Sequence, residues 1–404
     1  MKTTARTART ARTAALATVL AGALLAATPT ASAAPTDRGH TGHQALQTSL
    51  DRAVSQAHLP GAMAEVHDNG STWFGQSGTA DENTGRPLRP QDRFRIGSTT
   101  KTFVATALLQ LEAEHRLSLD DSVEQWLPGL VDGNGYDGSA ITIRQLLDHT
   151  SGIANFARDE TVSEEFQGPP FLQHRFDRFT PRQLVEIGIG VKPRFAPGTG
   201  WEYSDTNYVL AGLIVEQATG HSLGQEIADR FTEPLHLKST YEPAADDTGI
   251  HGPHGRFYSK LGPFDNPALP VYDVTELSPT WGYGSGDLVS TVSDLSTFFQ
   301  ALLGGRLLPP AQMAEMFTMR DPGNGWIPQS HYGLGIGSVA LSCGTVWGMG
   351  GAINGSWSYT FGTRDGRHLL ATSVNGDWAD GLPWGPVSVF TAELEAEFCG
   401  TTKA

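Results

Sequence analysis

Apolar residues recur at helical spacing in several segments, most clearly from Thr99 to about Glu114. The apolar positions of this segment fall on one helix face, and Glu112 and Glu114 lie outside that face. That face consists of Phe103, Val104, Ala107, Leu108 and Leu111. Similar patterns, bounded by capping and turn residues such as Gly220, predict helices over Gln44 to His58, Thr142 to Asp148, Pro181 to Ile189, Asn207 to Thr219, Leu223 to Phe231 and Pro386 to Phe398.

Strand patterns gather near the two ends of the chain. Asp68-Asn69-Gly70 favours a tight turn and predicts a hairpin between its flanking segments. The expected strands are Met63 to His67, Ser71 to Gly75, Tyr332 to Ser338, Val346 to Met349, Trp357 to Gly362 and Leu369 to Asn375. Residues from about 118 to 279 are expected to be mostly helical. The predicted fold class is α+β/α, an antiparallel β-sheet flanked by helices with a second, mostly helical lobe inserted.

The first 33 residues have the pattern of a secretory signal peptide. Basic residues precede an apolar stretch from Ala14 to Ala27, and Ala31-Ser32-Ala33 offers a cleavage site. We expect a signal at 1–33, a disordered tail at 34–43 and a folded domain at 44–404. The net charge of −15 argues against a nucleic-acid or anionic-membrane partner. We therefore expect a secreted monomer without a membrane anchor.

Cys343 and Cys399 are the two cysteines of a chain expected to be exported. A disulfide between them is favoured in an oxidising compartment, and two reduced core thiols are the alternative. Neither cysteine has a second cysteine or a histidine at ligand spacing, and His251 and His254 have no carboxylate at such spacing. We therefore expect no metal and no other cofactor.

Ser98 and Lys101 stand three residues apart where the helix from Thr99 is predicted to begin. This spacing places both side chains on one helix face. A helix N-terminus favours developing negative charge, and a partly desolvated lysine is able to take a serine proton. The pair is therefore a candidate nucleophile and base. On local grounds, a capping serine followed by a solvated lysine is an equally good interpretation.

A second polar cluster, Tyr203-Ser204-Asp205, follows a turn-rich segment and precedes the helix that ends at Thr219. A phenol beside a lysine ammonium is able to share a proton in general acid–base catalysis. Taken alone, the cluster is better explained by Asp205 capping the helix and Tyr203 packing at its entrance.

Three segments, in this order and spacing, resemble the motifs of the penicillin-recognising serine hydrolases. The chain is most similar to their secreted D-alanyl-D-alanine carboxypeptidases from actinomycetes, and more distantly to class C β-lactamases and related esterases. The three segments are Ser98-x-x-Lys101, Tyr203-Ser204-Asp205 and the glycine-rich stretch around Met349-Gly350-Gly351. Supporting segments are Leu146 to Gly152, Trp281 to Leu295 and Tyr332-Gly-Leu-Gly335.

The resemblance implies a role for each motif residue. Ser98 would be the nucleophile that forms an acyl-enzyme, with Lys101 as its proton partner. Tyr203 would relay the proton to the leaving amine. The backbone N–H groups of Ser98 and Ala352 would form the oxyanion hole. The other expected substrate-binding residues are Asp205, Trp281, Met349, Gly350 and Gly351.

Two of the three motifs depart from the family pattern. Asp205 stands where the family has asparagine, and a carboxylate there favours the ammonium form of Lys101. We therefore expect Tyr203 to carry more of the base role. Met349-Gly350 replaces the lysine or histidine and the threonine that help the family's carboxypeptidases hold a terminal carboxylate. Because a buried carboxylate without such partners is costly, we expect a less charged acyl donor.

These features predict a secreted serine hydrolase that forms acyl-Ser98 on D-peptide substrates, as D-alanyl-D-alanine carboxypeptidases and transpeptidases do. The first alternative is an esterase or D-stereospecific amidohydrolase on the same fold. The second is a weakly catalytic protein that binds peptidoglycan or β-lactams. In each case the partner is a small peptide, an ester or a peptidoglycan-derived molecule.

Several aromatic residues remain outside these motifs. His149 is expected to support a helix end rather than take part in the chemistry. Five tryptophans are able to line a groove for peptidoglycan or an aryl ester, although core packing is the expected role for most of them. These are Trp326, Trp347, Trp357, Trp378 and Trp384.

Overall fold

The computed structural model describes residues 42–264, 266–323 and 326–400. The predicted signal peptide, and the predicted tail up to residue 41, lie outside these ranges and stay predictions. Within them, no helix is both long and apolar enough to cross a bilayer. In the same ranges, no three or more His, Cys, Asp or Glu side chains are grouped closely enough to hold a metal ion.

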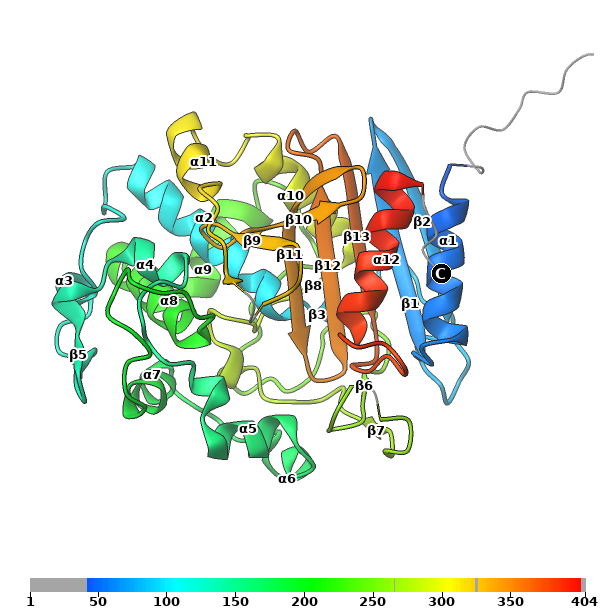
Figure 1. The fold of residues 1–404 in the computed structure, drawn as a ribbon, viewed down its shortest axis with the longest axis horizontal. Coiled ribbons are helices and arrows are strands. Elements are labelled where there is room, and N and C mark those ends of the chain that lie inside the picture. Colours follow the sequence, from blue (N-terminus) through cyan, green and yellow to red (C-terminus); the bar gives the residue numbers. More distant parts are fainter. Residues whose placement is uncertain (1–41, 265, 324–325, 401–404) are drawn as a thin grey trace, which may run out of the picture. The chain divides into compact units, whose positions relative to one another are not determined.

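A seven-stranded antiparallel sheet forms the centre of the domain (Figure 1). Its strand order is β2-β1-β13-β12-β11-β10-β9, so strands from the two ends of the chain pair with each other. β1 (Gly61–Asp68) and β2 (Ser71–Gly78) form the predicted hairpin, and Asn69 and Gly70 make its turn with φ of 48° and 90°. The remaining strands are β9 (Ser330–Tyr332), β10 (Gly337–Leu341), β11 (Gly344–Ile353), β12 (Ser356–Gly362) and β13 (His368–Val374).

The single strand predicted from Tyr332 to Ser338 is wrong. β9 and β10 are two antiparallel strands, joined by a turn in which Gly335 has a φ of 69°. Leu334 and Ile336 are buried within that turn. The apolar pattern therefore continues through the turn and hides it from a reading of the sequence.

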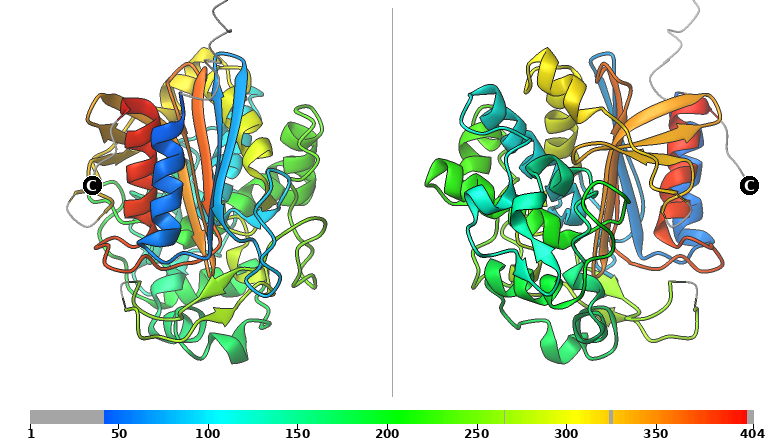
Figure 2. Two further views of the ribbon diagram at one scale, coloured as in Figure 1. Left: turned by 90° about the vertical axis from the view of Figure 1, so that its right-hand side faces the viewer. Right: turned by 60° about the vertical axis from the view of Figure 1, so that its left-hand side comes forward.

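Helices cover both faces of the sheet (Figure 2). α1 (Gln44–Ser55) and α12 (Pro386–Cys399) lie side by side on one face. The structure contains the predicted disulfide, in which Cys399 at the end of α12 is bonded to Cys343 between β10 and β11. α10 (Val292–Leu303), which the sequence interpretation did not identify, packs against β1, β12 and β13.

The mostly helical part of the chain lies between α2 (Thr100–Ala113) and α10. Its helices are α3 (Val123–Trp126), α4 (Ile143–Leu147), α5 (Glu160–Gln167), α6 (Phe171–His174), α7 (Pro181–Gly190), α8 (Asp205–Thr219) and α9 (Leu223–Ile227). Three two-stranded ladders join β3 (Phe94–Arg95) to β8 (Val289–Ser290), β4 (Asp132–Gly133) to β5 (Tyr136–Asp137), and β6 (Tyr258–Ser259) to β7 (Tyr272–Asp273). α11 (Pro310–Met316) follows α10 and was also not predicted.

α2 and α8 pack against each other in the interior of the domain. α2 is buried over nearly its whole length and not only on one face. The apolar face predicted from the sequence therefore accounts for only part of the buried surface of this helix. α8 ends at Gly220, which has a φ of 80° and forms the predicted C-cap. The packing of these two helices brings the candidate residues at their N-terminal ends together.

Candidate active site

Ser98 lies in a single 3₁₀ turn, Gly97–Thr99, that leads directly into α2. β11 packs against this turn. Gly97 has a φ of 50°, and a Cβ atom at this position would lie 2.5 Å from the backbone nitrogen of Ala352. Only glycine fits this close approach. The turn therefore holds Ser98 next to the strand that carries the third motif.

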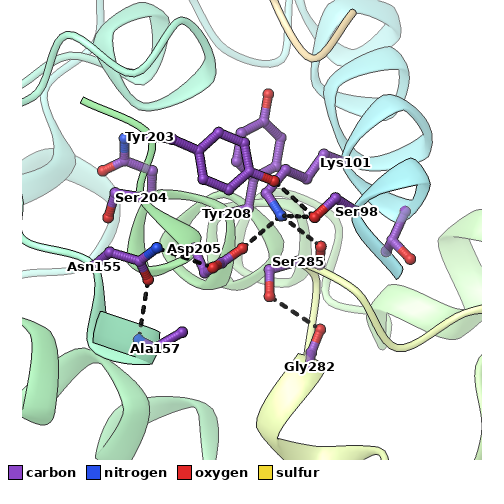
Figure 3. Close-up of polar contacts among 12 residues, drawn as sticks. Ser98, Lys101, Asn155, Ala157, Tyr203, Ser204, Asp205, Tyr208, Gly282 and Ser285 are labelled. Atoms are coloured by element: carbon purple, nitrogen blue, oxygen red, sulfur yellow. Dashed lines mark hydrogen bonds and ion pairs between the residues drawn. The ribbon is translucent and has the colours of Figure 1, made fainter. Parts of the chain in front are cut away.

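Lys101 is fully buried, and its ammonium is enclosed by acceptors (Figure 3). Its Nζ lies 3.1 Å from Ser98 Oγ, 2.6 Å from Asp205 Oδ1 and 2.7 Å from the carbonyl oxygen of Ser285. Three acceptors match the three N–H donors of a charged lysine. The residue at the N-cap position of α2 is Thr99 and not Ser98, which lies inside the 3₁₀ turn. The interpretation as a capping serine and a solvated lysine is therefore wrong.

Tyr203 completes the surroundings of the serine hydroxyl. Its phenol O–H donates to Ser98 Oγ over 2.7 Å, and Lys101 Nζ lies 4.8 Å from the centre of its ring. Burial, followed by the charge of Asp205, raises the pKa of Tyr203 well above its usual value. Tyr203 is therefore a neutral phenol in the resting site and holds a proton directly against Ser98.

Asp205 is the first residue of α8, and Ser204 occupies the capping position before it. The Asp205 carboxylate points to Lys101 instead of capping the helix, so the capping interpretation is wrong. Its second oxygen, Oδ2, accepts a bond of 3.1 Å from Asn155 Nδ2, and Asn155 Oδ1 accepts the N–H of Ala157. Asn155 therefore fixes the carboxylate that faces Lys101.

Two groups of the site, the side chain of Asn155 and the backbone carbonyl of Ser285, were not predicted from the sequence. Asn155 belongs to none of the recognised motifs, and only its place shortly after Leu146 to Gly152 hinted at a role. Ser285 lies within the recognised run from Trp281 to Leu295, but it contributes a backbone carbonyl. Because every residue has a backbone carbonyl, the residue type at position 285 does not indicate that this group accepts a hydrogen bond from Lys101.

His149 directly follows Asp148, the C-cap residue of α4, and supports the tyrosine, in line with its predicted structural role. Its ring lies 4.4 Å from that of Tyr203, and its Nδ1 accepts the backbone N–H of Ser204. Burial, followed by the charge of Lys101, lowers the pKa of His149 well below its usual value. A neutral imidazole thus orients the Tyr203 segment without contributing charge.

The third motif lies on β11, beside the serine. A Cβ atom at Gly351 would overlap the carbonyl oxygen of Ile96 and lie 2.8 Å from the backbone nitrogen of Ser98. The next strand residue, Ala352, lines the cleft together with Ser98. This arrangement suits the predicted oxyanion hole, in which the Ser98 and Ala352 N–H groups would face one carbonyl oxygen.

The cleft at Ser98 has two compartments, which share Phe264, Ala352 and Trp357. The first, of about 420 Å³, we call the Tyr203 compartment, and Ser98, Tyr203, Met349, Gly350 and Gly351 line it together with aromatic side chains. The second, of about 470 Å³, we call the Asp205 compartment, and its lining includes Asp205, Asp377 and the predicted Trp281.

Three of the five tryptophans flagged from the sequence line the Tyr203 compartment, namely Trp326, Trp357 and Trp384. Trp326 and Trp357 also pack against the hydrophobic core, so core packing as the sole role is wrong for these two, and it is wrong altogether for the exposed Trp384. Trp347 and Trp378 are absent from the described lining of either compartment. Trp378 is buried and donates its indole N–H to a backbone carbonyl, as a core residue does.

A serine hydroxyl bonded to a buried lysine and a buried tyrosine, at the floor of an open cleft, defines a class of protein. It is a serine hydrolase, in which the hydroxyl is placed to attack a carbonyl carbon.

Comparison with known proteins identifies the family. The family described as Beta-lactamase matches residues 44–380, so the chain belongs to the β-lactamase family of serine hydrolases. A D-stereospecific amidohydrolase from Streptomyces sp. is 44% identical in sequence, with a TM-score of 0.81 over 89% of this chain and 99% of that one. A D-amino acid amidase from Ochrobactrum anthropi SV3, complexed with D-phenylalanine, is 25% identical, with a TM-score of 0.74 over 88% and 99% of the two chains.

Curated relatives agree over a shorter stretch. Esterase EstB from Burkholderia gladioli is 34% identical over 203 residues, which are 48% of this chain and 50% of the esterase. The chain spans about half the length of the curated relatives it matches. The predicted fold and the predicted family are thus both confirmed.

Gly351→Ala should strongly reduce turnover without unfolding the protein. The added methyl group would push β11 away from the turn at Ser98, and losing one oxyanion donor typically costs about 3 kcal/mol, or about a hundredfold in kcat. The measurement is kcat on p-nitrophenyl acetate together with the melting temperature. Gly344→Ala is the matched control, because nothing lies within 4 Å of an added Cβ at this position of the same strand. Equal kcat in both variants would exclude an oxyanion hole at this contact.

Asp205→Asn should lower turnover by about tenfold or more and change the acid limb of the pH–rate profile. In the unmodified protein, the Asp205 carboxylate pairs with Lys101 at 2.6 Å, and the neutral amide of the variant removes this negative charge from the site. Asp132→Asn is the control, since the exposed Asp132 carboxylate accepts the Gly133 N–H and lines neither compartment. An unchanged limb and turnover in Asp205→Asn would contradict this role.

Proposed function

We propose that this protein is a D-stereospecific amidohydrolase that cleaves amides and esters of D-amino acids through an acyl-Ser98 intermediate. The geometry around Ser98 supports an acyl-enzyme, because the hydroxyl touches both a proton donor and a fixed ammonium. The sequence identity of 44% to a D-stereospecific amidohydrolase, across 99% of that chain, supports the choice of substrate.

The observation that carries the proposal is the composition of the Tyr203 compartment. Met349 and Gly350 line it where carboxypeptidases of this family have a cation or imidazole and a hydroxyl. D-alanyl-D-alanine peptides and β-lactams both present a carboxylate that needs such partners. Arg158 is the one lysine or arginine in the described lining, and its side chain is 59% exposed beside Glu202. This favours a neutral leaving group.

Arg158 is also the observation that favours a second candidate function. A guanidinium at the edge of the compartment is able to pair with a terminal carboxylate from solvent. D-alanyl-D-alanine carboxypeptidase activity is therefore the second candidate. A weakly catalytic protein that binds β-lactams or peptidoglycan would share the same acylation step but release the acyl group slowly.

The Asp205 compartment supports an acyl donor with a free amino group. Asp205 and Asp377 line it, and no lysine or arginine belongs to its described lining. The Asp205 side chain remains 19% exposed, and a carboxylate oxygen that accepts one bond from Asn155 has room for a second donor. An ammonium is favoured at such a position over a neutral acylated nitrogen.

The proposed reaction uses Tyr203 as a proton shuttle. At rest the phenol donates to Ser98 Oγ, and in the proposed reaction its O–H turns to the leaving nitrogen or oxygen once a substrate is bound. Ser98 Oγ then attacks the carbonyl carbon while its proton passes to the Tyr203 oxygen, and the phenol gives its own proton to the leaving atom. Lys101 keeps its charge and stabilises the negative charge that develops on Ser98 Oγ. Water then attacks acyl-Ser98 by the same route in reverse. This scheme keeps the expected larger role of Tyr203 without requiring a phenolate at rest.

We further propose that the protein acts outside the cytoplasm. The pattern of residues 1–33 supports export, and the Cys343–Cys399 disulfide is of the kind that persists in oxidising compartments. A monomeric state stays a prediction.

Ser98→Ala should abolish both turnover and labelling of the protein by a fluorophosphonate. The unmodified protein should be labelled at one site per chain and should hydrolyse D-phenylalanine p-nitroanilide at least about a hundredfold faster than the L-isomer. A D-alanyl-D-alanine peptide and a labelled penicillin, measured in parallel, test the other candidates. Equal rates on the two isomers, or faster cleavage of the D-alanyl-D-alanine peptide, would overturn the proposal.

The preference for a free amino group should depend on Asp205. The unmodified protein should favour D-phenylalanine p-nitroanilide over its N-acetyl derivative by about tenfold or more in kcat/KM, and Asp205→Asn should remove most of this ratio. The ratio cancels any loss of turnover that both substrates share. A preserved ratio in the variant would show that another group binds the amine.

A further inference from the structure

We infer that the Tyr203 compartment binds the leaving group and selects an aromatic or bulky apolar amine or alcohol over ammonia or methylamine. This inference rests on the proposed function and adds the chemical class of the leaving group. The preferred substrates would then be N-substituted amides, or esters of aromatic alcohols, rather than primary amides.

The position of Tyr203 assigns the two compartments to the two halves of the substrate. The phenol lies 2.7 Å from Ser98 Oγ and lines the first compartment but not the second. A group that hands its proton to the leaving atom must lie beside that atom. The leaving group therefore occupies the Tyr203 compartment, and the acyl group occupies the Asp205 compartment. Net, the bond from the acyl carbon to the leaving atom breaks and a bond from that carbon to Ser98 Oγ forms. Ser98 Oγ gives its proton to the Tyr203 oxygen, and Tyr203 gives its phenol proton to the leaving atom.

One wall of the Tyr203 compartment is a fixed aromatic stack. The Trp326 ring lies 4.8 Å from that of Tyr203 at an angle of 22°, and Trp201 packs on the edge of Trp326 at 5.3 Å. Such stacks hold their rings in place and present a flat apolar face. The same ring that orients the proton donor thus contacts the leaving group.

The rim of the compartment exposes apolar side chains. Trp384 is 47% exposed and Phe264 is 46% exposed, and both line the compartment. They are two of the five large apolar side chains that the described part of the chain exposes. The ring of Phe264 also packs edge-on against Trp357, 5.4 Å away. When exposed apolar side chains at the mouth of a cavity cover an apolar ligand, apolar surface is removed from water, which favours binding.

The sheet contributes further apolar side chains to the lining. Val339 on β10 and Phe361 on β12 belong to one face of the sheet and Met349 on β11 to the other, and each is nearly fully buried. A volume of about 420 Å³ is far larger than ammonia needs and suits an aromatic ring. The volume of the compartment, its aromatic wall, its exposed rim and the side chains from the sheet thus all favour an aromatic or bulky apolar leaving group.

The test compares D-alanine benzylamide with D-alanine methylamide, which share the acyl group and have aliphatic amines as leaving groups. The expected kcat/KM ratio is about tenfold or more in favour of the benzylamide. Trp384→Ala and Trp326→Ala should each lower this ratio by about threefold or more, because each removes part of the apolar surface. Trp347→Ala is the matched control on β11 and should keep the ratio, since Trp347 does not line the described compartment.

A second measurement does not require amide turnover. Benzyl alcohol should inhibit hydrolysis of p-nitrophenyl acetate competitively, more strongly than methanol, and Trp384→Ala should weaken this inhibition. If p-nitrophenyl acetate acylates Ser98 but D-amino acid amides are not cleaved, the proposed function fails while the inhibition still tests the compartment. A benzylamide-to-methylamide ratio near one, or inhibition unchanged in both Trp384→Ala and Trp326→Ala, would overturn the inference.

Discussion

The ion pair between the buried Lys101 and the partly exposed Asp205 is the interaction on which the rest of the site depends. Lys101 stands in the first turn of α2 and is fully buried, and Asp205 begins α8. An ammonium without a partner in the interior costs several kcal/mol, so the buried Lys101 requires the carboxylate of Asp205 beside it. The two helix ends are therefore held in one relative position. Because Tyr203 precedes α8 by two residues, the same constraint sets its distance to Ser98.

The backbone supplies a second constraint, which acts on the opposite side of Ser98. The 3₁₀ turn and β11 approach so closely that neither Gly97 nor Gly351 has room for a Cβ atom. β11 in turn is held by β12 and β10 within the sheet. Ser98 is thus fixed between a charged pair on one side and a sheet on the other. A nucleophile held in this way loses little freedom on reaching the transition state.

The sequence was informative where a side chain has both a fixed spacing and a chemical role. Ser98, Lys101 and Tyr203 meet as expected, and the strands near both chain ends pair as the alternation of apolar residues predicted. It was uninformative where the backbone acts, as at the carbonyl of Ser285 or at the turn between β9 and β10.

Long-range packing was a further source of error. Trp326, Trp357 and Trp384 lie far apart along the sequence or on separate elements, and composition alone favoured a core role for them. Only the fold shows that they converge on one cavity, whereas Trp347, which is close to Trp357 in sequence, does not line it.

The two departures from the family motifs have one electrostatic meaning. Asp205, in place of the family's asparagine, adds a negative charge to the Asp205 compartment, and Met349, in place of a lysine or histidine, removes a cationic or titratable group from the Tyr203 compartment. On the proposed assignment of the two compartments, the two changes together suit the cleft to an ammonium at one end and an apolar group at the other. The reversal of charge along the cleft, rather than any single residue, is what separates the proposed activity from that of the carboxypeptidases.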